Sequence, residues 1–250
     1  MASVEYEVKD KIAYITLNRP EKGNALNEQM FHELVEACQK YNDDPSALVG
    51  IISGNGRGFC SGIDLTEVDP KLAAKVDDIY LSILAVEKPL ISAVHGYALA
   101  QGAGIMLCTD IRIAAEDTKF GWPQVSRGIS SISAPTFAAH FLPRNFAYEY
   151  AFTAELFSAQ EACERFGIVN RVVPQGKPMS AAEDMAKRIL RNAPLAVQAM
   201  KKAIKLGSEM TFEQRLRTAA LIFLQVLQTE DAQEGLRAFA EKREPVFKGK

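Results

Sequence analysis

Two glycine-containing turns hold the residues of this 250-residue chain that are best placed to do chemistry: Phe59–Leu65 (Phe-Cys-Ser-Gly-Ile-Asp-Leu) and Tyr97–Ile105 (Tyr-Ala-Leu-Ala-Gln-Gly-Ala-Gly-Ile). Small residues that open a helix after a strand leave backbone N–H groups without intrahelical partners, and such groups bind oxygen anions. Two of them converging from different turns would form an oxyanion hole, which stabilises charge developing on a carbonyl oxygen. Tight packing of a loop against a helix is the alternative for each turn alone.

Apolar segments with turn residues between them place both turns. We expect buried strands at Lys11–Leu17, Leu48–Ile52, Leu90–Val94 and Ile111–Ala115. We expect helices that run from the N-cap Asn27 to near Asp44, from Val76 to Val86 and from Gly102 to Cys108. Asp64 is expected to cap a further helix that begins at Leu65. Strand–loop–helix units in this order predict parallel pairing and the α/β class.

The last third of the chain is predicted to be mainly helical, with segments at 147–154, 159–166, 181–191, 195–206 and 212–227. The run 219–224 is apolar almost all round, so a partner subunit is a candidate to cover it. No linker rich in Pro, Gly or Ser divides the chain. We therefore expect one domain over residues 1–250, with a core to about 190 and a helical region from about 191.

Composition excludes several classes of function. The net charge of −2 offers no general attraction for nucleic acid or an anionic membrane, and no apolar stretch of about 18 residues indicates a membrane span. The N-terminus mixes charges without an apolar core, so no signal peptide is expected. The four cysteines are widely spaced without a CxxC pair, which favours reduced thiols over a metal site or disulfides. We expect a cytoplasmic protein.

Five stretches in order along the chain resemble the crotonase superfamily of enoyl-CoA hydratases and isomerases: 18–27 (Asn-Arg-Pro-Glu-Lys-Gly-Asn-Ala-Leu-Asn), 59–65, 88–98 leading into 110–115, 159–170 and 241–247. The resemblance spans essentially the whole chain. It implies a crotonase-like spiral of ββα units whose C-terminal helices trimerise, as a homotrimer or a dimer of trimers. It also implies a coenzyme A thioester as ligand, with coenzyme A as part of the substrate and no other cofactor.

By position, the resemblance assigns the oxyanion hole to the backbone N–H groups of Ile63 and Gln101. Gln101 stands where the family usually has glycine, so it places a large amide where close backbone approach is usual. The resemblance also implies that the nucleotide and the pantetheine arm are held by residues in and before the first turn: Arg19, Lys22, Ala25, Leu26, Ser61, Gly62, Asp64 and Leu65.

The acids that the resemblance implies are missing. Hydratases of this family use two glutamates to move a proton and position water, and their positions fall on Gly104 and Gln124. Gly104 has no side chain, and Gln124 forms hydrogen bonds but exchanges no proton at neutral pH. The aspartate that some relatives use instead falls on Ile132.

Nearby side chains are candidates to replace those acids. Ser131 belongs to a hydroxyl cluster, but a serine without an activating partner is a poor acid or base. Local bonds between side chain and backbone are the favoured interpretation of this loop. Glu67, Asp77, Asp78 and Tyr80 are expected to be solvated surface groups, and His140 is expected to be a core or surface residue.

Two main hypotheses follow. The first is an enzyme of the hydratase/isomerase type that stabilises an enolate of a CoA thioester without the usual glutamate pair. The second is a catalytically weak or inactive acyl-CoA-binding protein, which Gly104 and Gln124 favour. Thioester hydrolysis is a further alternative. The sequence favours the enzyme because the CoA motifs are kept while the acyl end differs, and it leaves the acyl group and the reaction open.

Overall fold

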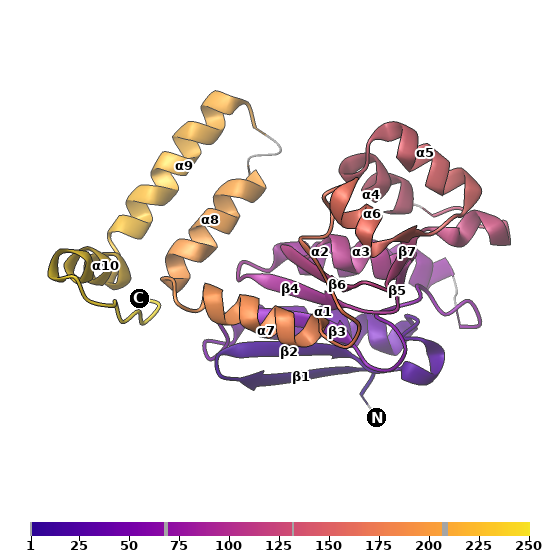
Figure 1. The fold of residues 1–250 in the computed structure, drawn as a ribbon, viewed down its shortest axis with the longest axis horizontal. Coiled ribbons are helices and arrows are strands. Elements are labelled where there is room, and N and C mark those ends of the chain that lie inside the picture. Colours follow the sequence, from indigo (N-terminus) through magenta and orange to yellow (C-terminus); the bar gives the residue numbers. More distant parts are fainter. Residues whose placement is uncertain (1, 68–69, 132, 207–209) are drawn as a thin grey trace.

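A six-stranded sheet forms the centre of the computed structural model, which describes residues 2–67, 70–131, 133–206 and 210–250 (Figure 1). β1 is antiparallel to β2, and every other neighbouring pair in this sheet is parallel. This arrangement confirms the α/β class and the predicted parallel pairing. In spatial order the strands are β1 (Val4–Lys9), β2 (Ile12–Leu17), β3 (Val49–Gly54), β4 (Leu90–Val94), β6 (Ile111–Ala115) and β9 (Arg171–Val173).

A second sheet has three short strands, β5 (Tyr97–Leu99), β7 (Lys119–Gly121) and β8 (Phe157–Ser158). β5 is parallel to β7, which is antiparallel to β8. These strands, together with β1 and β9, were not predicted from the sequence. The three strands of this sheet and β9 have only two or three residues each, too few to show a period, whereas the alternating burial of β1 matches its alternating sequence Val-Glu-Tyr-Glu-Val-Lys.

Helices cover both faces of the large sheet. α1 (Glu28–Asp43) begins as predicted, because the Asn27 side chain accepts a hydrogen bond from the Met30 N–H at 3.0 Å. The main core includes buried side chains of α1, of α2 (Pro70–Ala85) and of α3 (Gln101–Leu107), whereas α7 (Pro178–Ile189) packs on a separate apolar cluster (Figure 1). The remaining helices of this part are α4 (Ser133–Phe141), α5 (Arg144–Thr153), α6 (Ala159–Glu164) and the 3-10 turns η1 (Pro20–Lys22) and η2 (Pro123–Arg127).

The prediction that Asp64 caps a helix starting at Leu65 is wrong. Asp64 Oδ1 accepts hydrogen bonds from the Thr66 N–H at 3.1 Å and from the Thr66 hydroxyl at 2.6 Å, which closes a turn. An aspartate stabilises such a turn by the same bond that it would use as a helix cap. Helix α2 begins at Pro70.

Three helices form the C-terminal region and extend away from the sheet (Figure 1): α8 (Pro194–Leu206), α9 (Phe212–Leu227) and α10 (Glu230–Glu241). The predicted helix 212–227 is confirmed, and α10 was not predicted. Within the apolar run of α9, Ile222 is buried, whereas Leu221 is 64% and Phe223 61% exposed. This chain alone therefore leaves much of that apolar surface uncovered. No helix of the described part is long and apolar enough to cross a membrane.

Backbone hydrogen bonds join the two glycine-containing turns. The N–H groups of Phe59 and Cys60 donate to the Tyr97 carbonyl at 2.9 and 3.2 Å. The Leu99 N–H donates back to the Cys60 carbonyl at 2.9 Å, and Cys60 pairs with Ala98 as a parallel bridge. The segments are thus held side by side although they lie far apart in the sequence.

Gly102 brings α3 against the first turn. A Cβ atom at this position would lie 2.4 Å from the Cys60 carbonyl oxygen and 2.8 Å from the Cys60 Cβ. Both distances are shorter than van der Waals contact, and the carbonyl already accepts the Leu99 hydrogen bond. Only glycine fits here without separating the turns.

We expect Gly102→Ala to lower the free energy of unfolding by about 2–3 kcal/mol, because the added methyl group overpacks against backbone that has little room to move. Urea denaturation followed by circular dichroism measures the change. Gly235→Ala in α10 is the matched control, since a Cβ there would meet only the Phe247 ring at 3.7 Å or more. We expect that variant to be as stable as the parent chain or slightly more stable. Equal effects of the two substitutions would contradict the close approach.

Candidate functional site

A cavity of about 430 Å³ opens where the two turns meet. Its wall combines residues of both turns, Ser61, Ile63 and Gln101, with Gln124 and Arg127 of η2 and with serines 130, 131 and 133. The volume is in the range of small-molecule sites. The cavity thus brings together the two predicted oxyanion-hole residues, one of the two glutamate positions and the serine loop.

The Ile63 N–H is engaged within the protein. It donates a hydrogen bond to Gln101 Oε1 at 3.2 Å. Over the part of the chain that the structure describes, the Gln101 N–H has no hydrogen-bond acceptor. One predicted donor is therefore occupied by a side chain, and the other is open to a ligand.

Ala100 holds the start of α3 in an unusual conformation. Its φ of 51° and ψ of −117° lie in a region that residues with a side chain rarely adopt. Two backbone bonds maintain it, from the Ala100 N–H to the Gly121 carbonyl at 2.9 Å and from the Gly104 N–H to the Ala100 carbonyl at 3.3 Å. Strain of this kind persists where the surrounding structure enforces it, commonly at functional sites.

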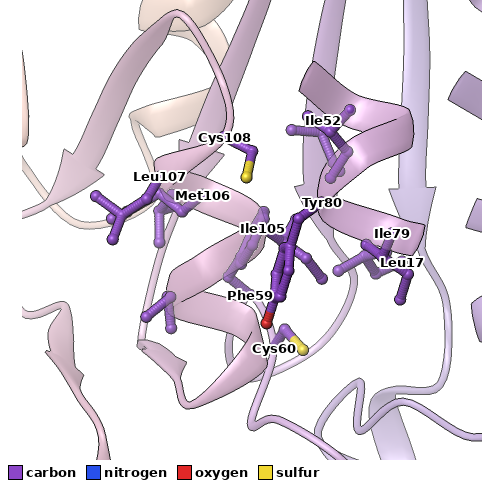
Figure 2. Close-up of a cluster of buried hydrophobic side chains, with 14 of the residues drawn as sticks. Leu17, Ile52, Phe59, Cys60, Ile79, Tyr80, Ile105, Met106, Leu107 and Cys108 are labelled. Atoms are coloured by element: carbon purple, nitrogen blue, oxygen red, sulfur yellow. The ribbon is translucent and has the colours of Figure 1, made fainter. Parts of the chain in front are cut away.

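The Tyr80 ring fills the space beside Gly104. A Cβ atom at Gly104 would lie 2.6 Å from Tyr80 Cε1 and 2.8 Å from the phenol oxygen. Figure 2 shows the ring between α2 and α3, with its hydroxyl end toward Cys60. The expectation that Tyr80 is a solvated surface group is wrong, because the residue is 5% exposed and packs edge-on against Phe137.

The sequence contained the signal for this burial. Val76, Ile79, Tyr80 and Ile83 recur at the spacing of one helix face, and all four are buried. Burial raises the pKa of the Tyr80 phenol, so the group stays protonated at neutral pH. The space in which a glutamate at position 104 would lie is thus occupied by an aromatic ring with a neutral hydroxyl.

Gln124 lies on the cavity wall, and its side-chain amide is unpaired within the described part of the chain. Both its Nε2 and its Oε1 are buried, and neither has a hydrogen-bond partner among the described residues. Leaving such atoms unpaired costs about 1–3 kcal/mol. A ligand group or a water molecule with a donor and an acceptor would recover that free energy. The amide can therefore hold a polar group by hydrogen bonds, but it cannot act as an acid or a base.

The serine loop forms local bonds. Ser131 Oγ accepts a hydrogen bond from the Ala134 N–H at 3.1 Å and lies 3.4 Å from Ser133 Oγ, which lies 3.4 Å from the Tyr80 hydroxyl. This confirms the local-bond interpretation for Ser131. Within the described residues no histidine or carboxylate is hydrogen-bonded to its hydroxyl, so nothing there activates it as a nucleophile.

Few titratable groups remain at the cavity. Asp77 is exposed and is the only carboxylate on the described wall, whereas Asp78 and His140 are exposed and lie outside it. Burial raises the pKa of the Cys60 thiol to about 12, which excludes a thiolate nucleophile at neutral pH. The predicted aspartate position, Ile132, lies outside the described residues.

Arg19 fastens the loop that precedes the first turn. Its guanidinium donates to Asp64 at 3.3 Å, to Glu67 at 3.1 Å and to the Ala25 carbonyl at 2.6 Å. Arg19 is 9% exposed, so its guanidinium is used largely inside the protein. Lys22, with a side chain 48% exposed and Nζ 4.0 Å from Asp64, is the freer cation of the two.

The other predicted coenzyme A contacts lie around the first turn. Ala25 and Leu26 are buried, and the Leu26 N–H donates to the Gly62 carbonyl at 2.7 Å. Leu26 also pairs with Ile63 as a parallel bridge. Ser61 and Leu65 are on the cavity wall. These residues thus either line the cavity or hold the turn that does.

Comparison with known proteins gives one consistent family. The enoyl-CoA hydratase/isomerase family model matches residues 7–250. The chain is 34% identical to (E)-benzylidenesuccinyl-CoA hydratase of Thauera aromatica, over 98% of this chain and 99% of that protein. It is 34% identical to 2,3-dehydroadipyl-CoA hydratase of Escherichia coli K12, over 97% of each.

Solved structures agree with this assignment. An enoyl-CoA hydratase from Bacillus anthracis superimposes with a TM-score of 0.93 at 29% identity, over 99% of this chain and all of that one. The predicted crotonase-like fold is therefore confirmed. The match of family model, sequence and fold over nearly the full length shows that this chain belongs to the enoyl-CoA hydratase/isomerase family, the crotonase superfamily.

Proposed function

We propose that the protein binds an acyl-CoA thioester with its carbonyl oxygen between the N–H groups of Ile63 and Gln101. The observation that carries this proposal is the joining of two distant turns at the wall of one cavity, with both residues on that wall. Two N–H donors at one oxygen stabilise the negative charge that develops when a thioester becomes an enolate. The thioester supplies coenzyme A, and this chemistry requires no further cofactor.

The coenzyme A moiety would lie along the first turn and the loop before it. Lys22 is the exposed cation there, suited to a phosphate, and Ser61 and Leu65 are on the cavity wall. Arg19 would act indirectly, because its bonds to Asp64 and Ala25 hold the loop in shape. The family's acyl-CoA chemistry and this distribution of groups support the assignment together.

The reaction we infer is enolate-stabilising chemistry of the hydratase/isomerase type without the glutamate pair. Gly104 offers no carboxylate and Tyr80 fills its space, while the Gln124 amide orients a ligand oxygen or a water without exchanging a proton. A positioned acid or base is worth about 10²- to 10⁴-fold in rate. Simple hydration of a straight-chain enoyl-CoA is therefore expected to be slow, with Asp77 as the remaining carboxylate of the described wall.

An acyl-CoA-binding protein with little turnover is the second candidate function. The Tyr80 ring beside Gly104 and the occupied Ile63 N–H favour it. Thioester hydrolysis through a covalent intermediate has less support, because burial raises the pKa of the Cys60 thiol and Ser131 lacks an activating partner among the described residues.

We also propose that copies of the chain assemble through α8–α10, as a homotrimer or a dimer of trimers. The support is the exposed apolar surface of α9, where Leu221 and Phe223 are more than half exposed in the isolated chain. Exposed apolar patches of this kind commonly mark subunit interfaces.

Calorimetric titration with butyryl-CoA, together with turnover assays on crotonyl-CoA and on branched, cyclic and aromatic acyl-CoAs, tests the function. We expect butyryl-CoA to bind and crotonyl-CoA to be hydrated slowly, with faster conversion of another member of the panel. Tight binding with no conversion of any member would favour the binding protein over the enzyme. Absence of binding to any CoA thioester would refute both.

A glutamate at position 104 is expected to be accommodated only when Tyr80 is removed. Gly104→Glu should lower the free energy of unfolding by about 2–3 kcal/mol, because its Cβ collides with the ring. In a Tyr80→Ala background the same substitution should cost at least about 1 kcal/mol less, since the two sites share one space. Urea denaturation of the four proteins in this cycle measures the coupling. Additive losses would show that the ring does not compete for the space.

Gln124→Leu is expected to raise the stability of the protein and to lower its affinity for an acyl-CoA. Replacing a buried unpaired amide by an apolar group of similar size should raise the free energy of unfolding by about 1 kcal/mol. The same change should weaken binding of the best acyl-CoA of the panel, which loses its polar contact, and leave the affinity for free coenzyme A unchanged. Thermal denaturation and calorimetry measure the two effects. A destabilised variant would mean that the amide is already satisfied in the free protein.

A further inference from the structure

The oxyanion-hole donor that the proposed function assigns to a thioester already binds a carbonyl oxygen of the protein itself. The Ile63 N–H donates to Gln101 Oε1 at 3.2 Å. A side-chain amide oxygen is a carbonyl oxygen, as a thioester oxygen is, so the two groups compete for one N–H. We propose that the Gln101 side chain is an internal ligand of the oxyanion hole, and that its displacement makes Gln101 a residue that determines which oxygen the site accepts. This inference rests on the proposed function.

The backbone on both sides leaves room for this amide. Gly62 has a φ of +109°, and a Cβ atom there would lie 3.2 Å from Gln101 Oε1 and 2.8 Å from the Ala100 Cβ. A side chain at position 62 would therefore crowd the contact. Ala100, held in its rare conformation by Gly121, fixes the point from which the Gln101 side chain starts. The amide thus lies in a place that its neighbours shape.

Burial also distinguishes this contact from that of a mobile surface side chain. Gln101 is 9% exposed, and it lines the same cavity as the Ile63 N–H that it occupies. A ligand entering the cavity must therefore move the Gln101 amide or leave the Ile63 N–H unused. The backbone N–H of Gln101, in contrast, needs no displacement, because no acceptor from the described residues occupies it.

The competition should weaken every ligand whose oxygen uses the Ile63 N–H. A net hydrogen bond between neutral groups shifts an equilibrium by about fivefold, so the internal contact lowers the affinity for a thioester by a factor of that order. An enolate oxygen forms charge-assisted bonds roughly twice as strong, and it displaces the amide more completely. The cost of displacing the amide is the same for both oxygens, so only an oxygen that binds this N–H more strongly than the amide does gains much affinity from it.

Two substitutions at position 101 test the internal ligand. Gln101→Met keeps the length of the side chain and removes the carbonyl oxygen, whereas Gln101→Glu places a charged acceptor beside the Ile63 N–H. Calorimetric titration with butyryl-CoA should show affinity about 3- to 10-fold higher for the Met variant and at least about tenfold lower for the Glu variant. Free coenzyme A, which has no thioester carbonyl, is the matched ligand control. Its affinity should agree within about twofold among the three proteins, because it does not compete for this N–H.

The resonance of the Ile63 amide gives a readout that does not depend on binding or turnover. In the ligand-free parent chain this proton should be hydrogen-bonded, and in Gln101→Met it should move upfield and exchange faster with solvent. Gln101→Ala should shift the Ile63 resonance in the same direction. This second variant controls for a change caused by a poor fit of the methionine side chain. Equal butyryl-CoA affinity of parent and Met variant, with an unmoved Ile63 resonance, would overturn the inference. If no variant bound any CoA compound, the proposed function would fail, while the resonance would still decide whether Gln101 holds this N–H.

Discussion

The backbone pairing of the two turns is the constraint on which the rest of the site depends. Cys60 is the central residue of this pairing. Its N–H donates a hydrogen bond to the Tyr97 carbonyl, and its own carbonyl accepts one from the Leu99 N–H. The same carbonyl lies against Gly102. These contacts fix the distance between the Ile63 and Gln101 backbones without using a side chain of either residue. The site can therefore tolerate glutamine at position 101, because the N–H donors belong to the main chain. The same closeness is what allows the Gln101 amide to reach Ile63.

The part of the site around Gly104 and Gln124 is uncharged, and its residues depend on one another. Gly104 is compatible with the buried Tyr80 ring, and the Tyr80 hydroxyl faces Ser133 at 3.4 Å. Gln124 adds an uncharged amide to the same wall. A carboxylate restored at position 104 would meet the Tyr80 ring in its space. Position 124 would offer it an amide and no partner carboxylate. These residues form a packed, uncharged arrangement that suits orientation of a ligand better than proton transfer.

Much of the fold could be predicted from the sequence, because the larger elements carry a complete period. The Asn27 cap, the parallel strands β2, β3, β4 and β6, and α9 all follow from apolar spacing and capping residues. Strands of two or three residues could not be predicted, since hydrogen bonds to distant segments define them. Asp64 was assigned to a helix because an aspartate stabilises a turn and a helix start by the same kind of bond. In the site, the positions of Ile63, Gln101 and Gln124 were predictable from the family resemblance. The Gln101 contact and the Tyr80 ring beside Gly104 were not, because both depend on packing between separate elements.

In the proposed complex, a thioester oxygen binds between the N–H groups of Ile63 and Gln101. A crystal structure of the protein with butyryl-CoA tests this arrangement most directly. We expect the thioester oxygen to lie about 2.7–3.1 Å from both nitrogen atoms, with the Gln101 amide turned away from Ile63. A bound thioester whose oxygen lies elsewhere, with the Gln101 amide still on the Ile63 N–H, would contradict it.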